Sequence, residues 1–246
     1  MIVDCISDLH GFYPELEGGD LLIVAGDLTA NDMYNELVKC DDWLRSQKYK
    51  YKKVIVIAGN HDSYLYDGFD NPFFLPFSDY EADSRDKIPF AEYLCDSGTE
   101  FVHTWSDENN LLCKQNFKIW GSPWTRRFEG MNPHCKAFTV DMEEELVDKF
   151  ELIPDDVDIL ITHSPPWGVL DLVRRYGPFS HEREENCGSE HLASSLKYVF
   201  RPRLHVFGHI HEGYGQKEVF HGCISINASH VNERYEPVNK PIRVIL

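Results

Sequence analysis

This chain of 246 residues lacks the features that mark disulfide-stapled, membrane-spanning and secreted proteins. Its seven cysteines are odd in number and scattered, without a C-x-x-C pair, which argues against a disulfide framework or a cysteine zinc site. We interpret them as small core residues. No apolar run approaches the roughly 20 residues that cross a bilayer, and the N-terminus has no basic segment followed by an apolar core. We therefore expect a soluble, cytoplasmic protein that does not bind membranes.

Basic charge is also scarce. The 24 lysines and arginines face 41 aspartates and glutamates, which gives a net charge of −17. This balance opposes the sequence-independent attraction to polyanions, so we expect no extended nucleic acid partner. A small anionic substrate is compatible with it if bound cations reverse the field locally. The chain has no internal repeats and no low-complexity linker, which predicts a single domain over residues 1–246.

Polar side chains follow five apolar segments, at the point where each segment ends. The segments at residues 1–7, 20–25, 54–58, 158–162 and 204–207 predict buried strands. The side chains that follow them are Asp8 and His10, Asp27, Asn60, His163, and His209 with His211. Because parallel strands end at the same edge of a sheet, we expect these side chains to converge on one site.

The rest of the pattern predicts three helices and a second sheet. Helices are expected around residues 33–44, 139–150 and 189–199, with Met33, Met142 and Val199 on their buried faces. The expected N-caps are Asn31 or Asp32 for the first helix and Ser189 for the third. Residues 99–121 predict a strand pair, and residues 219–226 and 242–246 predict the last strands. Residues 63–90 and 173–187 show no clean period and predict loops, the former a variable insertion.

Seven side chains of metal-ligand type are too many for one tetrahedral ion, and a two-metal site uses them more naturally. The set combines two carboxylates, one amide oxygen and four imidazoles, a mixture that suits manganese, iron or zinc. Asp27 is the best candidate for a bridging ligand, because it stands between groups that belong to either side. We expect two divalent ions, with Mn²⁺ as first choice and Fe, Zn or Mg as alternatives.

The order of the motifs D-x-H, G-D, G-N-H-D, a lone His and G-H-x-H resembles that of the calcineurin-like metallophosphoesterase superfamily. The sequence segments at residues 121–124, 158–166, 201–208 and 211–215 are similar to motifs of the metallophosphoesterase-domain-containing (MPPED, or UPF0046) group of this superfamily. The resemblance implies an α/β fold, a four-layer α/β/β/α sandwich of two mixed sheets flanked by helices. It also implies two ligand sets, Asp8, His10, Asp27 and His211 for the first metal and Asp27, Asn60, His163 and His209 for the second.

The resemblance further implies a two-metal phosphodiesterase of small nucleotides, cyclic ones among them, that works by attack of a metal-activated hydroxide. His61 is the candidate general acid, and Asp62 could orient it or raise its pKa, although a turn carboxylate is an equal interpretation. Arg126 and Arg127 could clamp a phosphate and Trp124 could stack a nucleobase, with a core role as the alternative for the tryptophan. A phosphomonoesterase or nuclease would use the same metal core. A regulatory protein that binds metal or nucleotide without turnover is a further alternative, and the sequence leaves the oligomeric state open.

Overall fold

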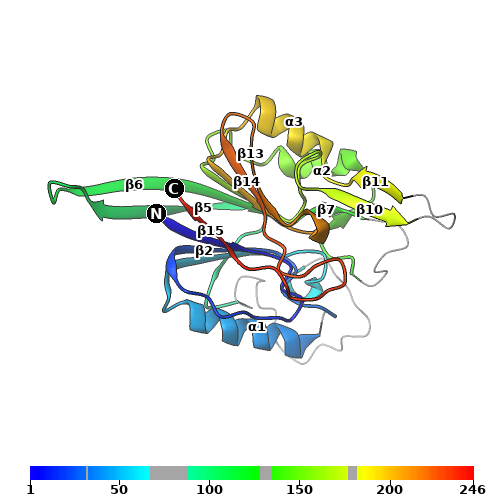
Figure 1. The fold of residues 1–246 in the computed structure, drawn as a ribbon, viewed down its shortest axis with the longest axis horizontal. Coiled ribbons are helices and arrows are strands. Elements are labelled where there is room, and N and C mark those ends of the chain that lie inside the picture. The colour runs from blue at the N-terminus through cyan, green and yellow to red at the C-terminus, as the bar shows by residue number, and fades with distance from the viewer. Residues whose placement is uncertain (32, 67–87, 128–134, 177–181) are drawn as a thin grey trace.

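Two large mixed sheets pack face to face, with helices on their outer faces (Figure 1). The computed structural model describes residues 1–31, 33–66, 88–127, 135–176 and 182–246. None of the helices in these ranges is long and apolar enough to span a membrane.

The first sheet has the strand order β15–β1–β2–β3–β4. Its strands are β1 (Ile2–Ile6), β2 (Gly19–Ala25), β3 (Tyr51–Ile57), β4 (Glu92–Tyr93) and β15 (Ile242–Ile245). Helix α1 (Tyr34–Gln47) returns the chain between β2 and β3, so that these two strands run parallel. Strand β15 pairs antiparallel with β1, which makes the sheet mixed.

The second sheet has the strand order β13–β14–β12–β9–β6–β5. Its strands are β5 (Ser97–Ser106), β6 (Leu112–Ser122), β9 (Ile159–Thr162), β12 (Leu204–Phe207), β13 (Gly215–Val219) and β14 (Cys223–Asn227). The four inner strands are parallel and the two outer ones antiparallel. Helices α2 (Glu143–Phe150) and α3 (Glu190–Tyr198) cover its outer face.

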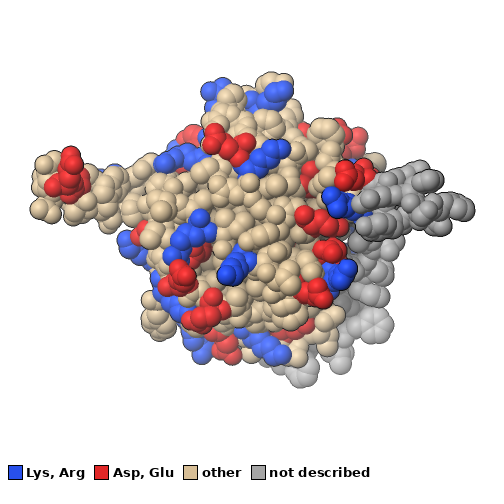
Figure 2. All heavy atoms as spheres, in the orientation of Figure 1, with Lys and Arg blue, Asp and Glu red and all other residues tan. Residues whose placement is uncertain are grey.

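Two short strand pairs and two 3₁₀ turns complete the described elements. The pairs are β7 (Thr125–Arg126) with β8 (Thr139–Val140), and β10 (Leu172–Tyr176) with β11 (Glu182–Asn186). The turns are η1 (Ser63–Leu65) and η3 (His211–Gly213). The hairpin of β5 and β6 projects from the body as a long arm (Figure 1). On the face of the molecule seen in Figure 2, basic and acidic side chains are intermingled.

Three apolar layers hold this arrangement together. In β2, Leu21 and Ile23 face the layer between the sheets, whereas Leu22 and Val24 face the layer under α1. This is why the strand reads as a continuous apolar run. A third layer lies under α2 and α3 and contains Leu160 of β9. The three layers confirm the predicted α/β/β/α sandwich of two mixed sheets.

The expected helix faces are wrong at the helix ends. Met33 and Met142 are the N-cap residues of α1 and α2, and Val199 is the C-cap residue of α3. Their exposures are 52, 58 and 52%, because a cap residue lies outside the helical repeat and its side chain leaves the buried face. Ser189 caps α3 as expected, since its hydroxyl accepts from the Leu192 amide.

Three expectations about loops and strands also change. The segment 173–187, expected to be a loop, contains most of the β10–β11 pair, and β-pairing in its polar sequence leaves no hydrophobic alternation to detect. The strand expected at 219–226 is broken by a turn at residues 220–222, where Gly222 has φ +82°. Residues 139–140, assigned to the second helix, belong to β8. Of the loop expected at 63–90, residues 67–87 lie outside the described residues.

Candidate metal centre

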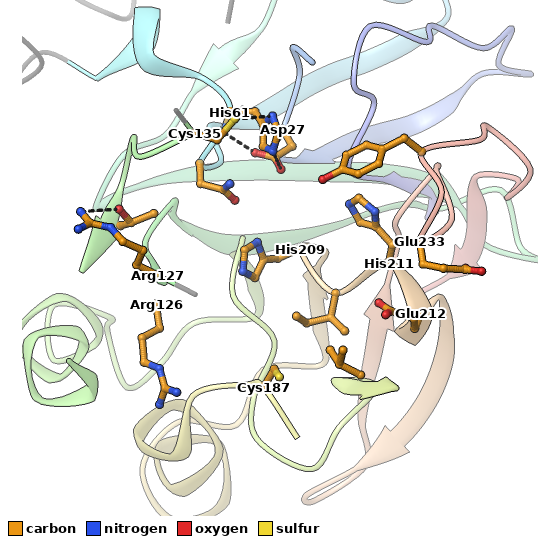
Figure 3. Close-up of a pocket in the computed structure, with 15 residues that line it drawn as sticks. Asp27, His61, Arg126, Arg127, Cys135, Cys187, His209, His211, Glu212 and Glu233 are labelled. Atoms are coloured by element: carbon orange, nitrogen blue, oxygen red, sulfur yellow. Dashed lines mark hydrogen bonds and ion pairs between the residues drawn. The ribbon is translucent and has the colours of Figure 1, made fainter. Parts of the chain in front are cut away.

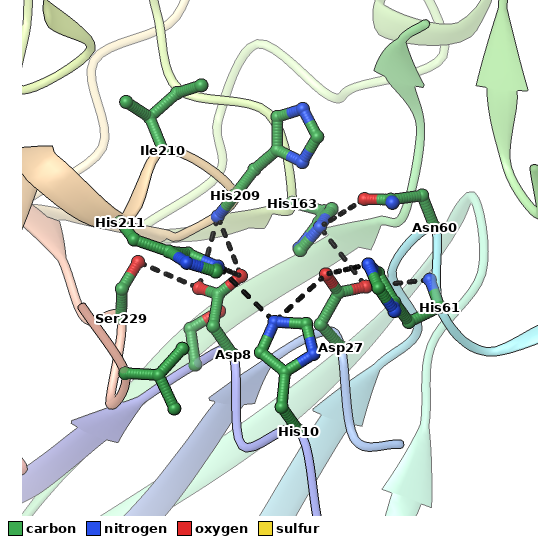
Figure 4. A network of polar contacts seen from close by, with 12 residues as sticks. Asp8, His10, Asp27, Asn60, His61, His163, His209, Ile210, His211 and Ser229 are labelled. Atoms are coloured by element: carbon green, nitrogen blue, oxygen red, sulfur yellow. Dashed lines mark hydrogen bonds and ion pairs between the residues drawn. The ribbon is translucent and has the colours of Figure 1, made fainter. Parts of the chain in front are cut away.

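All seven predicted ligands lie together at the carboxyl ends of five strands (Figure 4). They follow β1 (Asp8, His10), β2 (Asp27), β3 (Asn60), β9 (His163) and β12 (His209, His211). The two carboxylates are almost completely buried, with Asp8 0% and Asp27 2% exposed. Buried carboxylates beside several imidazoles need compensating positive charge, which protons or cations can supply.

The first group of these side chains is formed by Asp8, His10 and His211, whose ligand atoms all lie within 4.8 Å of one another. His211 Nε2 is 3.3 Å from Asp8 Oδ1 and also 3.3 Å from His10 Nε2. His10 Nε2 in turn lies 3.6 Å from Asp27 Oδ2. Two imidazole nitrogens thus converge with carboxylate oxygens on one small volume, an arrangement that a cation satisfies.

The second group is formed by Asp27, His163 and His209, again within 4.8 Å. His163 Nε2 is 3.4 Å from Asp27 Oδ1 and 3.1 Å from Asn60 Oδ1. The carboxylate of Asp27 therefore turns Oδ2 to the first group and Oδ1 to the second. This is the position that a bridging carboxylate between two metal ions occupies.

The imidazoles are held in fixed orientations by backbone carbonyls. The Nδ1 atom of His163 lies 2.9 Å from Ala25 O, and that of His61 lies 2.8 Å from Ala30 O. The Nδ1 atom of His211 lies 3.1 Å from Asn232 O. In each ring Nδ1 donates its proton to the carbonyl, which leaves Nε2 to face the carboxylates. Metal-binding histidines in proteins are oriented in this manner. The donor set and its orientation therefore fit two divalent ions.

The backbone at the strand ends is strained. Asp8, His10, Asp27 and His209 have φ values of 49, 43, 51 and 67°. Non-glycine residues rarely adopt this left-handed conformation, and such outliers concentrate at functional sites. Here the conformation turns the chain after β1, β2 and β12, where it directs these four side chains into the common cluster.

Two glycines of the sequence motifs lie against the ligands. A Cβ atom on Gly208 would stand 2.0 Å from Asp8 Oδ2 and 2.1 Å from Ser7 Oγ. A Cβ atom on Gly59 would stand 2.2 Å from Asp27 Oδ1. These glycines are required because the ligand carboxylates pack directly on the backbone.

The imidazoles of the cluster fall into two kinds, those with a lowered pKa and those with a raised pKa. Burial lowers the pKa of His10 to about 3 and that of His209 to about 3, so both rings are neutral. Burial also lowers the pKa of His163, but Asp27 outweighs it and raises the pKa to about 9. The histidines hold the pKa of Asp8 and of Asp27 below its usual value despite burial. Both carboxylates are therefore ionised and stabilised by positive charge.

The two predicted catalytic residues have different surroundings. His61 lines the pocket, with Nε2 4.0 Å from Asp27 Oδ2. Burial lowers its pKa, but Asp27 and the contact with Cys135 outweigh this and raise the pKa to about 10. Cations bound beside Asp27 would offset that attraction and lower the pKa again.

The carboxylate of Asp62 accepts hydrogen bonds from the amides of Gly59 (2.8 Å), Leu28 (3.1 Å) and Thr29 (3.0 Å). Among the described residues no contact joins it to the His61 ring. Burial and the nearby Asp27 carboxylate raise the pKa of Asp62 to about 7. The geometry favours the interpretation of Asp62 as a turn carboxylate that ties the end of β2 to the end of β3.

A pocket of about 130 Å³ opens over the cluster (Figure 3). Arg126 and Arg127 lie on one side of it, and Glu212 and Glu233 on the opposite side. Trp124 is not among the residues that line this pocket. Its Nε1 donates to Asp96 Oδ2 (2.7 Å), and Lys149 Nζ lies 3.9 Å from its ring centroid, so the structure favours the core role of this tryptophan.

Three further residues of the site have no signal in the sequence. Cys135 lines the pocket with Sγ 3.1 Å from His61 Nδ1, which departs from the interpretation of the cysteines as core residues. Ser229 donates from Oγ to Asp8 Oδ2 (2.8 Å). The ring of Tyr235 lies 4.9 Å from that of His10. Each comes from a segment far along the chain, so only the fold brings it to the cluster.

Comparisons with known proteins find matches to this chain in family, sequence and fold. A family model described as calcineurin-like phosphoesterase matches residues 1–213. Metallophosphoesterase domain-containing protein 1 of Homo sapiens is 36% identical over 250 residues, which cover 98% of this chain and 70% of that protein. A UPF0046 protein of Caenorhabditis elegans is 31% identical, and the match covers 97% of this chain and 58% of that protein. Phosphopantetheinyl hydrolase from Mycobacterium tuberculosis has a similar fold, with a TM-score of 0.55, 19% identity, and coverage of 99% of this chain and 95% of that chain.

Proposed function

Because the chain belongs to the calcineurin-like phosphoesterase family, we propose that it is a two-metal phosphodiesterase acting on a small nucleotide or similar diester. The observation that carries the proposal is the position of Asp27, whose two oxygens face separate groups of histidines. A single ion would use only one of these groups. We propose that a small substrate binds in the pocket above the cluster. Because the net charge of −17 opposes attraction to polyanions, we propose no extended nucleic acid and no membrane as partner.

Two divalent ions, when bound, would supply an activated water and would neutralise charge on the phosphoryl oxygens. Asp8, His10 and His211 would hold the first ion, Asn60, His163 and His209 the second, and Asp27 would hold both. We propose Mn²⁺ as the physiological metal, with Fe, Zn or Mg as alternatives, since the donors are oxygen and imidazole.

His61 would donate the proton that the leaving alkoxide needs. Its Nδ1 is bound to Ala30 O, so the proton on Nε2 is the one that faces Asp27 and the pocket. A proton donor must lie within hydrogen-bond reach of the leaving oxygen, and His61 is next in sequence to the proposed ligand Asn60. Asp62 would act indirectly, by fixing the turn on which His61 stands.

Arg126 is the better candidate for a contact with the substrate phosphate than Arg127. Arg127 Nη1 already forms an ion pair with Asp141 Oδ1 (2.8 Å), and Nη2 lies 3.5 Å from Thr139 Oγ1. In the described ranges Arg126 forms no ion pair, and its side chain lines the same pocket. A free guanidinium can bind a phosphoryl oxygen without first breaking another pair.

The test uses purified protein loaded with Mn²⁺ and two chromogenic substrates. We expect bis(p-nitrophenyl) phosphate to be hydrolysed faster than p-nitrophenyl phosphate, and the reverse preference would refute the diesterase proposal in favour of a phosphomonoesterase. Asp27→Ala should abolish turnover and lower the metal content, whereas Asp42→Ala, a change at an exposed carboxylate of α1, should do neither. Full activity in Asp27→Ala would refute the two-metal site. Metal binding without turnover of either substrate would instead indicate a regulatory binding protein.

A further inference from the structure

The segment between β14 and β15 forms a closed loop beside the first group of ligands. His230 and Asn239 join its two ends, since the Asn239 amide donates to His230 O (3.1 Å) and His230 Nδ1 lies 2.7 Å from Asn239 O. The His230 amide also donates to Ser7 O (2.8 Å), next to Asp8. The loop is therefore fixed to the end of β1, where the first ligands stand.

Within this loop Asn232 organises a tight turn. Its Oδ1 accepts from the amides of Arg234 (2.9 Å) and Glu236 (2.9 Å), and its own amide donates to Glu236 O (3.0 Å). The turn places Tyr235 in the left-handed conformation, with φ 59°. A bulky residue is uncommon in this conformation, and here the hydrogen bonds of the turn hold the Tyr235 backbone in it.

One carbonyl links the turn to the cluster. The oxygen of Asn232 accepts from the Tyr235 amide (2.9 Å) and is also the partner of His211 Nδ1 (3.1 Å). The position of the tyrosine and the orientation of a proposed ligand therefore depend on the same atom.

The ring of Tyr235 lies over the imidazoles of the first group. Its centroid is 4.9 Å from that of His10 and 5.1 Å from that of His211, with interplanar angles of 75 and 87°. These are edge-to-face contacts, in which one ring restrains the other. In the second group His163 and His209 pack edge to face on each other instead, with centroids 5.0 Å apart. Tyr235 itself is 40% exposed and lines the pocket, whereas His10, whose ring it contacts, is 3% exposed.

We infer that Tyr235 is a positioning residue for the first metal, whose ring restrains His10 and His211 and slows the escape of the ion. The inference rests on the proposed two-metal function and adds that removal of the Tyr235 ring weakens binding of the first ion and leaves the second unaffected. Groups that orient metal ligands without touching the metal typically change affinity by about 10- to 100-fold, and we expect an effect in this range.

The experiment measures metal binding directly. Metal-free protein is titrated with Mn²⁺ and with Co²⁺, whose absorption spectrum reports ligand geometry, and the bound ions are counted after gel filtration in metal-free buffer. We expect Tyr235→Ala to lose about tenfold or more in affinity at one site and to retain fewer ions than the wild type. Tyr235→Phe keeps the ring and should bind both ions with wild-type affinity. Tyr198→Ala, a change at an exposed tyrosine of α3, is the matched control.

Two further readouts separate positioning from folding. The thermal stability of metal-free Tyr235→Ala should be only slightly lower than that of metal-free wild type, because only the ring contacts are lost, while the stabilisation gained on adding Mn²⁺ should be clearly smaller. Turnover of Tyr235→Ala should recover at high Mn²⁺, with kcat restored. Wild-type affinity at both sites in Tyr235→Ala, or an equal loss in Tyr235→Phe, would overturn the inference while leaving the proposed function intact. A wild-type protein that binds only one ion would refute both.

Discussion

Replacement of Gly208 by alanine should disrupt the first group of ligands through a single added methyl group. Gly208 follows β12, and its Cβ would stand 2.0 Å from Asp8 Oδ2, whereas ordinary contacts begin at 3.4 Å. The carboxylate or the backbone must therefore yield by about 1.4 Å (3.4 − 2.0). Asp8 cannot move freely, because it accepts from the His209 amide (3.0 Å) and from Ser229 Oγ (2.8 Å).

The magnitudes follow from this displacement. Overpacking of a buried site costs about 1–3 kcal/mol of folding free energy, which the chain should survive. A misplacement of about 1 Å near reacting groups can cost about 100-fold in rate, so we expect a loss of activity far larger than the loss of stability suggests. Gly208→Ala should also bind less than two equivalents of Mn²⁺, because Asp8 is a proposed ligand of one ion only.

The measurement combines chemical denaturation, metal counting and hydrolysis of bis(p-nitrophenyl) phosphate. Gly168→Ala is the control, since Gly168 has φ +77° but no atom within 4 Å of the position that an added methyl group would take. The free energy of unfolding of Gly168→Ala should fall by about 1–2 kcal/mol through backbone strain alone, and the variant should keep its metal ions and its turnover. If Gly208→Ala kept both ions and full activity, the close packing of Asp8 on this glycine would have no functional importance.

Two other predictions concern buried polar groups. Asp62→Asn should lower turnover only slightly and leave the metal content unchanged, because the side-chain oxygen of asparagine can still accept the hydrogen bond from the Gly59 amide. An unchanged rate would reject an orienting role for Asp62. Burial lowers the pKa of His205 to about 3 from its usual 6.5, so the unfolded chain takes up a proton on acidification while the folded chain does not. The contribution of His205 to the free energy of unfolding is therefore fully present above pH 6.5 and is lost as the pH drops towards 3. Between pH 7 and pH 5 the free energy of unfolding should fall by about 2 kcal/mol. His205→Phe should therefore flatten the dependence of unfolding free energy on pH over this window, and an equal slope in both proteins would contradict the shift.

The sequence predicts the parts of the site that are local to a strand and its turn. Asp27 is an example, since a buried apolar run followed by Gly-Asp is visible in the sequence without any tertiary contact. Cys135 and Tyr235 are counterexamples, because their roles depend on contacts with His61 and His10, which are remote in sequence. No local pattern distinguishes a cysteine beside a catalytic candidate from a cysteine in the core.

The helix ends illustrate a different limit. The apolar spacing that marks the buried face of α1 continues through Met33, although the helical hydrogen bonds begin after it. Hydrophobic periodicity cannot show where a helix stops, since that depends on capping geometry. Side-chain contacts are equally absent from the local sequence. Arg126 and Arg127 are equivalent there, and only the folded chain shows that Arg127 forms an ion pair with Asp141.

The pairing of β15 with β1 has a consequence for folding during synthesis. Ile2 lies opposite Ile245, so β1 finds its outer neighbour only after about 240 further residues have been synthesised. Until then one edge of β1 remains unpaired beside an already formed βαβ unit, and such edges promote association with other chains. Contacts of this sequence separation are slow to form. We therefore expect the last strand to limit the rate of productive folding, and a nascent chain stalled before it to depend on chaperones.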